Sequence, residues 1–247
     1  MSTVDETRMT LSIHPSAEQT GEAAASEVAA LVQCHPAAVL GLATGSSPLP
    51  LYEALAKNEV DLAAVTAFAL DEYIGLPPGH PQSYAAVIGH HVVEPLGMTP
   101  GRVHVPDGNP RDEHRSGEAY EAAIGAAGGI DLQILGIGSN GHIGFNEPGA
   151  AFSSRTRVVR LAERTRQDNA RFFAAPEDVP THAMTQGLAT IFEARHLLLI
   201  AHGRGKATAI KRALTGPVTE DFPASLLQLH PRTSLFLDSE AASLLES

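Results

Sequence analysis

An apolar strand that leads directly into a glycine-rich turn constrains this chain most. Residues 130–135 are predicted to form a short buried strand, and the turn after it contains Gly136, Gly138, Gly141 and Gly144. A short apolar run of this kind is typical of a strand in a parallel sheet. Glycines supply the positive φ angles that let a backbone fold tightly over a ligand. An α/β protein with a ligand site at this turn is therefore expected.

Two side chains in the turn can carry out proton transfer. His142 and Glu147 are five residues apart, and the glycines and Pro148 leave no room for a helix between them. A carboxylate that hydrogen-bonds one imidazole nitrogen fixes the tautomer at the other nitrogen. A histidine held in this way can act as a general acid or base near neutral pH.

The same turn also fits two other interpretations. Gly136, Gly138 and Gly141 form the spacing G-x-G-x-x-G of dinucleotide-binding proteins. That motif needs a helix directly after the third glycine, and the sequence through Gly144 to Pro148 cannot begin one there. The simpler alternative is a glycine-rich connection whose histidine only hydrogen-bonds a loop carbonyl.

Composition narrows the class of protein. With 247 residues and 43% hydrophobic residues, the chain is expected to form a single α/β domain over residues 1–247. The charge of 17 − 28 = −11 disfavours binding to nucleic acid or to anionic membranes. Cys34 is the single cysteine, and neither a secretory signal nor a membrane span is expected. These features favour a cytoplasmic protein.

The remaining pattern predicts alternating strands and helices. Further strands are expected at 11–14, 39–42, 65–70, 102–105, 155–161, 197–201 and 233–237. Helices are expected at 16–32, with Ser16 as the cap, and at 49–56, 83–93, 111–126, 165–173, 183–191 and 207–214, followed by a short terminal helix. His90 and His91 are adjacent on a predicted helix and share no face, so no metal site is expected there.

Small and cationic residues at two predicted helix starts suggest a phosphate site. Thr44, Gly45, Ser46 and Ser47 precede a helix, where hydroxyls and exposed N–H groups can bind an anion. No lysine follows the glycine, so this is not a Walker loop. Lys206 begins a later helix and is a second candidate. The alternatives are an ordinary capped connection and an exposed lysine.

An acidic pair ends the strand predicted at 65–70. Ligands of parallel sheets collect at the carboxyl ends of strands. Asp71 and Glu72 point in opposite directions on an extended chain, so one of them can face a given crevice, and the sequence does not choose. The alternative is a solvated loop or a helix cap.

Four stretches taken together resemble glucosamine-6-phosphate deaminases. They are G-L-A-T-G-S-S-P at 41–48, D-E-Y-I-G-L at 71–76, G-S-N-G-H-I-G-F-N-E-P at 138–148 and S-R-T-R at 154–157. The resemblance runs from about 11 to 237. It implies a Rossmann-like three-layer α/β sandwich with a mostly parallel sheet and a helical lid at about 162–184. The implied reaction converts glucosamine 6-phosphate and water to fructose 6-phosphate and ammonia, without a cofactor or metal.

The same resemblance implies roles for individual residues. Asp71 would be the base that moves a proton from C2 to C1, and His142 would open the sugar ring, oriented by Glu147 with Asn140 completing the relay. Thr44 to Ser47, Arg171 and Lys206 would hold the phosphate. Some family members have aspartate in place of Asn140. An amide adds no negative charge, so His142 would depend more on Glu147.

Three other functions fit parts of this pattern. A 6-phosphogluconolactonase shares the architecture and a glycine-histidine turn, but it hydrolyses an ester. A non-catalytic sugar-phosphate sensor would need the phosphate site alone. Galactosamine 6-phosphate differs from the expected substrate by the configuration at C4, which the sequence does not address.

Regulation is expected to be absent. Regulated members of the family are hexamers that N-acetylglucosamine 6-phosphate activates through a serine after F-N-E-P, a basic pair on the next strand and an aromatic residue in the tail. This chain has Gly149 to Phe152 in the loop, Val159 in place of the second basic residue, and no aromatic residue after Phe236. A monomer or small homo-oligomer without that activation is therefore expected.

Overall fold

A computed structural model describes residues 8–58 and 60–245, and its centre is a seven-stranded sheet in which every pair of neighbours is parallel. The strand order is β1-β10-β9-β6-β2-β3-β5. The strands are β1 (Arg8–His14), β2 (Val39–Leu42), β3 (Thr66–Ala69), β5 (Val103–His104), β6 (Leu132–Leu135), β9 (Leu197–Ala201) and β10 (Arg232–Asp238). The expected parallel α/β architecture is confirmed.

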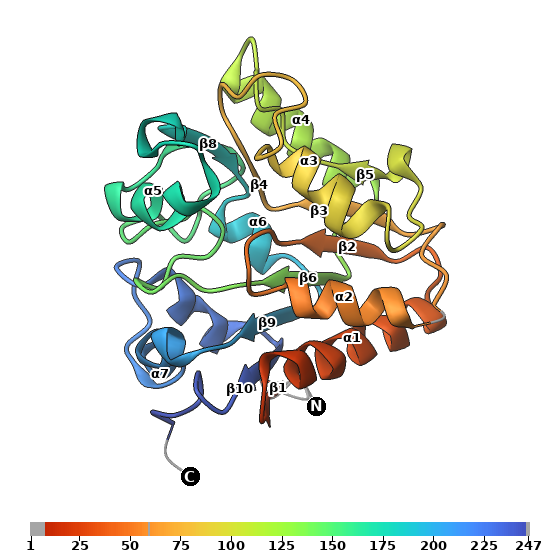
Figure 1. Cartoon of the computed structure of the whole chain (residues 1–247), viewed down its shortest axis with the longest axis vertical. Coiled ribbons are helices and arrows are strands. Elements are labelled where there is room, and N and C mark those ends of the chain that lie inside the picture. The colour runs from red at the N-terminus through yellow and green to blue at the C-terminus, as the bar shows by residue number, and fades with distance from the viewer. Residues whose placement is uncertain (1–7, 59, 246–247) are drawn as a thin grey trace, which may run out of the picture.

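Helices cover both faces of this sheet (Figure 1). The α-helices are α1 (Ala17–Cys34), α2 (Leu49–Lys57), α3 (Tyr84–Ile88), α4 (Glu113–Ala126), α5 (Glu163–Asn169), α6 (Leu188–Phe192) and α7 (Ala207–Thr215). Short 3-10 helices are η2 (Pro100–Arg102), η3 (Ala170–Phe172), η4 (Pro176–Asp178), η5 (Arg204–Lys206) and η6 (Pro223–Leu229), and η1 (Gly89–Val93) is a π-helical turn.

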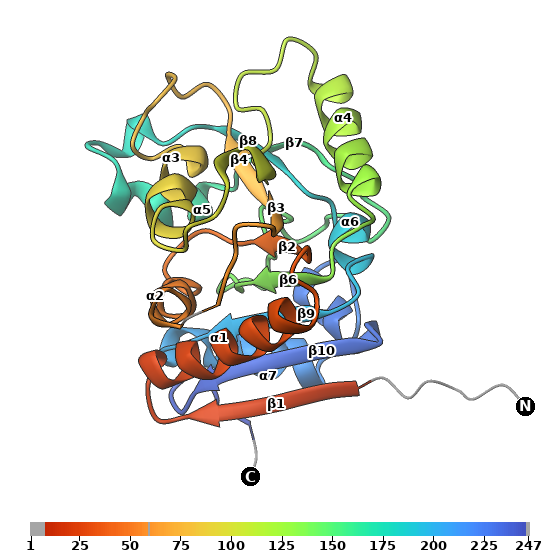
Figure 2. The same ribbon diagram turned by 90° about the vertical axis from the view of Figure 1, so that its right-hand side faces the viewer.

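The order of the connections explains the three layers. From β1 through β2 and β3 to β5 the chain moves one way along the sheet, and from β5 through β6 and β9 to β10 it moves the other way. Right-handed crossovers then place α1 and α2 on one face and α4, α6 and α7 on the other. Figure 2 shows α2 and α3 on one side of the strands and α4 and α6 on the other. The direction in which successive strands are added to the sheet reverses between the neighbouring parallel strands β2 and β6.

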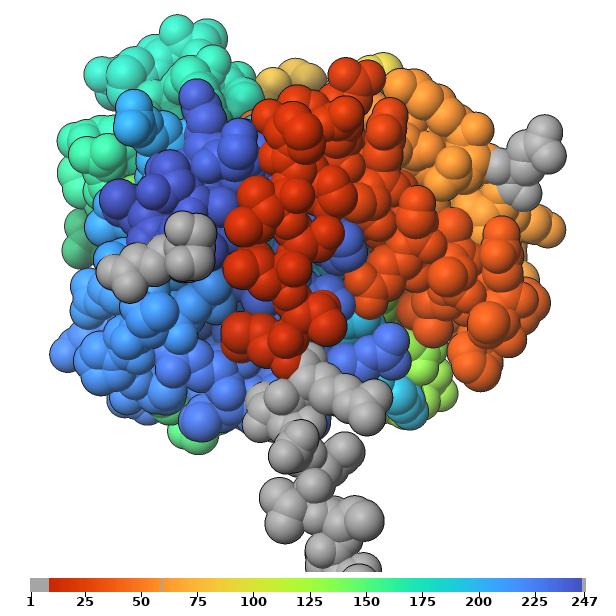
Figure 3. Space-filling view, turned by 90° about the horizontal axis from the view of Figure 1, so that it is seen from below, coloured from red at the N-terminus to blue at the C-terminus, as the bar shows by residue number. Residues whose placement is uncertain are grey.

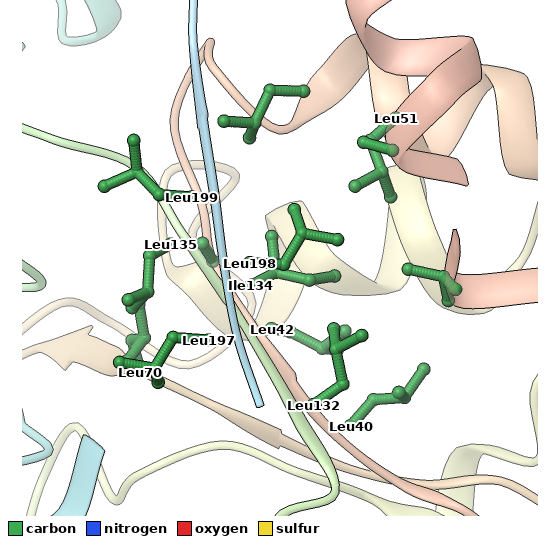
Figure 4. Close-up of a cluster of buried hydrophobic side chains, with 14 of the residues drawn as sticks. Leu40, Leu42, Leu51, Leu70, Leu132, Ile134, Leu135, Leu197, Leu198 and Leu199 are labelled. Atoms are coloured by element: carbon green, nitrogen blue, oxygen red, sulfur yellow. The ribbon is translucent and has the colours of Figure 1, made fainter. Parts of the chain in front are cut away.

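Leucine and isoleucine side chains fill the space between the layers (Figure 4). Leu42 on β2, Ile134 on β6 and Leu198 on β9 are each at most 1% exposed, and Leu51 on α2 is fully buried above them. Strands covered on both faces need such continuous apolar runs. Burying one such side chain stabilises the fold by about 1.5–3 kcal/mol.

The first and last strands of the chain lie side by side at one edge of the sheet. β1 pairs with β10 so that Leu11 lies opposite Leu235. Figure 3 accordingly shows the red atoms of the N-terminal part beside the blue atoms of the C-terminal part. Ser16 caps α1 as predicted, because its hydroxyl accepts the N–H of Gln19 at 3.2 Å.

A second, antiparallel sheet was not predicted. It consists of β4 (Asp71–Tyr73), β8 (His182–Thr185) and β7 (Arg157–Arg160), in the order β4-β8-β7. The acidic pair therefore lies on a strand of its own, and the strand expected at 155–161 belongs to this sheet. The helix expected at 183–191 is wrong over its first half, because residues 182–185 pair with β4 and β7, and α6 begins at Leu188.

Two helix predictions also differ from the structure. The helix expected at 83–93 ends at Ile88 and continues as η1, and the short terminal helix is replaced by turns at 239–244. In that turn Asp238 accepts the N–H of Ala241 at 2.7 Å. A carboxylate that bonds backbone N–H groups nearby favours a turn over a continued helix.

Candidate active site

The candidate active site is a cavity of about 450 Å³ at the carboxyl ends of β2 and β6. The order in which strands are added to the sheet reverses between these two strands. Ligands of open parallel sheets bind at this position. In Figure 1 the arrowheads of β6 and β9 point toward the side on which α5 and α7 lie. The predicted residues in the cavity wall are Thr44, Gly45, Ser46, Ser47, Asp71, His142, Arg171 and Lys206. Asn140 and Glu147 do not line the cavity.

Glycines let the turn after β6 fold this tightly. The ring of His142 lies where a side chain on residue 138 would be, because a Cβ atom there would come within 2.3 Å of it. Gly141 has a φ of +87° and packs against the ring of Phe222. Any larger residue at either position would displace His142 or strain the backbone. The G-x-G-x-x-G spacing therefore positions a histidine.

Glu147 contacts the ring of His142 without lining the cavity itself. Its Oε2 atom lies 3.6 Å from Nδ1 of His142, which is an ion-pair contact slightly longer than a hydrogen bond. Nδ1 is buried and has no hydrogen-bond partner within the described residues. The other ring nitrogen, Nε2, is left for a ligand. The structure brings the two predicted residues together without a hydrogen bond between them, and the histidine could accept or donate a proton at Nε2.

Two further residues hold Glu147 in place. Asn140 donates from Nδ2 to Oε2 of Glu147 at 2.7 Å, and Thr165 of α5 donates to Oε1. Burial alone would raise the pKa of Glu147, but the nearby His142 ring and the hydrogen bonds from Thr165 and Asn140 outweigh it and hold the pKa below its usual range. Glu147 is therefore a carboxylate, and Asn140 acts on it as a donor.

The structure decides between Asp71 and Glu72. Glu72 turns away from the cavity, and its carboxylate accepts the backbone N–H groups of Tyr73, Tyr84 and Ala85, each at 2.8 Å. Asp71 lines the cavity and is 5% exposed. Burial and the neighbouring charge of Glu72 raise the pKa of Asp71 to about 8, although the Thr44 hydroxyl opposes this rise. A carboxyl group that titrates near neutral pH suits a general base.

The other end of the cavity is suited to an anion. The loop 44–47 precedes α2, and Gly45 has a φ of +90°. Lys206 donates from Nζ to the carbonyl of Ile137 at 2.6 Å. Burial lowers the pKa of Lys206, and Arg171 lowers it further while Asp168 opposes this. Two cations that lie close enough to repel each other, beside hydroxyls, would be stabilised by a phosphate.

Several cavity residues were not predicted. From the segment expected to be a lid, α5 and η3 contribute Arg164, Thr165, Asp168, Asn169 and Phe172. Spacings of three and four residues place most of these side chains on one helix face. That periodicity was the available signal, but polar residues on a helix face do not identify what they cover.

Two properties concern the described part of the chain as a whole. Within residues 8–58 and 60–245, no group of three or more His, Cys, Asp and Glu side chains is arranged to hold a metal ion. No helix in those ranges is long and apolar enough to cross a membrane.

Comparison with known proteins identifies the family. Residues 14–236 match the family model described as glucosamine-6-phosphate isomerases/6-phosphogluconolactonase. The chain belongs to this family. A glucosamine-6-phosphate deaminase of Arthrobacter sp. (strain FB24) is 53% identical over 95% of this chain and 92% of its own length. One of Bifidobacterium longum (strain DJO10A) is 54% identical over 91% of this chain and 88% of its own.

Solved structures show the same architecture. A monomeric glucosamine-6-phosphate deaminase superposes with a TM-score of 0.93 at 40% identity, covering 96% of this chain and all of that one. A 6-phosphogluconolactonase from Trypanosoma brucei superposes with a TM-score of 0.79 at 20% identity, covering 98% of this chain and all of that one. The second likeness shows a shared fold alone. The expected resemblance to the deaminases is confirmed.

Proposed function

We propose that this chain is a glucosamine-6-phosphate deaminase, a hydrolase of C–N bonds in amino sugar catabolism. It converts glucosamine 6-phosphate and water to fructose 6-phosphate and ammonia. The proposal rests on a single cavity that contains three features: a buried carboxyl group whose pKa lies near neutral pH, a histidine in contact with a carboxylate, and a cationic end. Identity above 50% to named deaminases supports the same reaction.

The cationic end anchors the substrate. Thr44, Ser46, Ser47, Arg171 and Lys206 hold the phosphate, with the backbone of Gly45 close to it. Binding energy from this remote group positions the sugar for the proton transfers.

Ring opening is assigned to His142. Its Nε2 atom takes the proton from O1 and returns a proton to O5, while Glu147 stabilises the charge that the imidazole gains. Asn140 and Thr165 keep the Glu147 carboxylate in position.

Isomerisation is assigned to Asp71. Its ionised carboxyl group takes the proton from C2 of the open-chain sugar and delivers it to C1, while O1 gains a proton and the amino nitrogen loses one, which leaves a C=N bond at C2. Water adds to that bond and ammonia leaves. These steps move only protons and water, so the chemistry proposed needs neither a metal nor an organic cofactor.

Three substrates separate this proposal from its competitors. Purified protein should release ammonia from glucosamine 6-phosphate faster than from galactosamine 6-phosphate, and should not hydrolyse 6-phosphogluconolactone. Faster turnover of the galactosamine compound would reassign the substrate. Lactone hydrolysis without ammonia release would replace the proposal, and binding of glucosamine 6-phosphate without turnover would indicate a sensor.

The proposal also covers organisation and location. Residues 1–247 would form a single domain in which about 162–184 is a lid over the cavity, supported by the contacts of α5 with the cavity. The protein would act in the cytoplasm as a monomer or small homo-oligomer, without nucleic-acid partners, in line with its charge of −11. Sedimentation of the purified protein tests the assembly, and a hexamer would contradict it.

A further inference from the structure

The side chain of Asn146 joins three segments of the chain. It is fully buried and directly precedes Glu147. Its Nδ2 atom donates to the carbonyl of Ile143 at 3.0 Å and to that of Gln186 at 2.8 Å. Its Oδ1 atom accepts a hydrogen bond from Nη1 of Arg157 at 3.0 Å. The turn after β6 is thereby attached to β7 and to the residue that follows β8.

Arg157 fixes the orientation of this amide. A guanidinium can only donate, so the oxygen of Asn146 faces it and the amide nitrogen is left for the two carbonyls. A hydrogen bond from a charged donor is roughly twice as strong as a neutral one. Burial lowers the pKa of Arg157, and no acidic side chain in the described ranges forms an ion pair with it. Its charge therefore acts on neutral acceptors, which are the Asn146 amide and the carbonyl of Arg155 at 3.2 Å.

The antiparallel sheet that carries Asp71 also carries this attachment. Thr185 of β8 lies opposite Asp71 of β4 on one side and opposite Arg157 of β7 on the other. The Thr185 hydroxyl accepts the backbone N–H of Phe145 at 3.2 Å. A Cβ atom on Gly144 would come within 3.0 Å of that hydroxyl and 3.5 Å of Asp71, so the turn packs closely on the sheet. Attachment to strands holds a site more precisely than attachment to loops.

We propose that Arg157 and Asn146 are positioning residues, and that the link between them keeps Glu147 in contact with His142. This inference deepens the proposed function and rests on it for the roles of Glu147 and His142 in catalysis. Neither Arg157 nor Asn146 lines the cavity, so both act through the turn and not on the substrate.

Removing the guanidinium tests the link. In Arg157→Met the Oδ1 atom of Asn146 loses its donor, and kcat should fall roughly 10–100-fold, because a misplacement of about 1 Å can cost that order. KM should change little, since the residues at the cationic end of the cavity make no contact with the link. Arg157→Lys keeps a cationic donor and should recover most of kcat. An unchanged kcat in Arg157→Met would overturn the proposal.

Arg155→Met is the matched control. Arg155 precedes the same strand, and its guanidinium forms ion pairs with Glu121 and Glu193 and not with the turn. Both substitutions remove an arginine together with its contacts, so both should lower Tm. Only Arg157→Met should lower kcat. Equal losses of kcat in the two variants would indicate a general effect of stability and would overturn the link.

A double substitution tests the route to Glu147. If Arg157 acts by keeping Glu147 in contact with His142, Arg157→Met should lower kcat much less in a Glu147→Gln background than in the wild type. The same fold-loss in both backgrounds would mean that Arg157 acts by another route and would overturn the proposal.

Hydrogen exchange separates this inference from the proposed function, because it needs no substrate. Backbone amides at 143–147 should exchange faster in Arg157→Met than in the wild type, while those of β6 and β9 should not change. Faster exchange together with no ammonia release by the wild type would support the link and reject the deaminase. Ammonia release by the wild type with unchanged exchange at 143–147 in Arg157→Met would reject the link alone.

Discussion

Asp71→Asn should make the protein less active and more stable. The substitution keeps the shape of the side chain and removes its basicity. The unfolded chain releases the Asp71 proton near pH 3.8, whereas burial in the folded protein raises the pKa to about 8. Wild-type protein therefore loses stability as pH rises between these values, and the variant avoids that loss.

The size of the effect follows from the shift. Between pH 5 and pH 7 the wild type loses roughly 2.7 kcal/mol at Asp71, because each pH unit inside the interval costs about 1.36 kcal/mol. For a chain of this length that corresponds to roughly 5–10 °C in Tm. The difference in Tm between Asp71→Asn and the wild type should therefore be about 5–10 °C larger at pH 7 than at pH 5. Turnover should fall roughly 10²–10⁴-fold with phosphate binding retained.

Two measurements check this prediction. Thermal unfolding of both proteins across pH 4 to 9 gives the stability difference, and ammonia release from glucosamine 6-phosphate gives turnover. A stability difference that does not change with pH would refute the raised pKa of Asp71. Deamination at a near wild-type rate would refute its role as the base and make Glu72 the candidate.

Glu72→Gln is the matched control. The Glu72 carboxylate accepts three backbone N–H groups, and an amide nitrogen cannot accept any of them. Each donor left without an acceptor costs about 1–3 kcal/mol, which opposes the gain from removing a charge whose pKa burial raises, so the control should be stabilised at pH 7 much less than Asp71→Asn.

Three further predictions address the relay and regulation. His142→Gln should reduce turnover of the cyclic substrate more than that of an open-chain analogue, and equal losses would remove the ring-opening role. Thr165→Val should lower the free energy of unfolding by about 1–3 kcal/mol above pH 5 and by less near pH 3.5. The reason is that donors that lower the pKa of Glu147 stabilise its ionised form, which is less populated at low pH. Urea unfolding measures both losses, and equal losses at the two pH values would contradict this prediction. The rate should depend hyperbolically on the concentration of glucosamine 6-phosphate and should not respond to N-acetylglucosamine 6-phosphate. The reason is that Val159 stands where regulated members have the second basic residue of the activator site. The first basic residue, Arg157, donates from its guanidinium to Asn146 at 3.0 Å. A sigmoidal curve that the acetylated sugar makes hyperbolic would refute the last prediction.

Local sequence determined the central sheet and much of the cavity wall. The strand over 132–135 and the glycines after it are adjacent in the chain, so the turn that positions His142 is encoded within a few residues. The hydroxyl loop at 44–47 and Lys206 follow strands whose apolar runs identify them. Because parallel strands end at one edge, these segments had to converge.

Tertiary structure alone decided which acidic residue faces the cavity and what supports it. Asp71 and Glu72 are neighbours with opposite directions, and pairing of β4 with β8, from far along the chain, sets which one points inward. The helix expected at 183–191 was wrong for the same reason, since short apolar runs take the conformation that their partners impose. The contacts of Thr165 with Glu147 and of Asn169 with Tyr73 also join distant segments. Sequence periodicity reports local backbone preference, whereas these contacts exist only once α5 packs over the carboxyl ends of the strands.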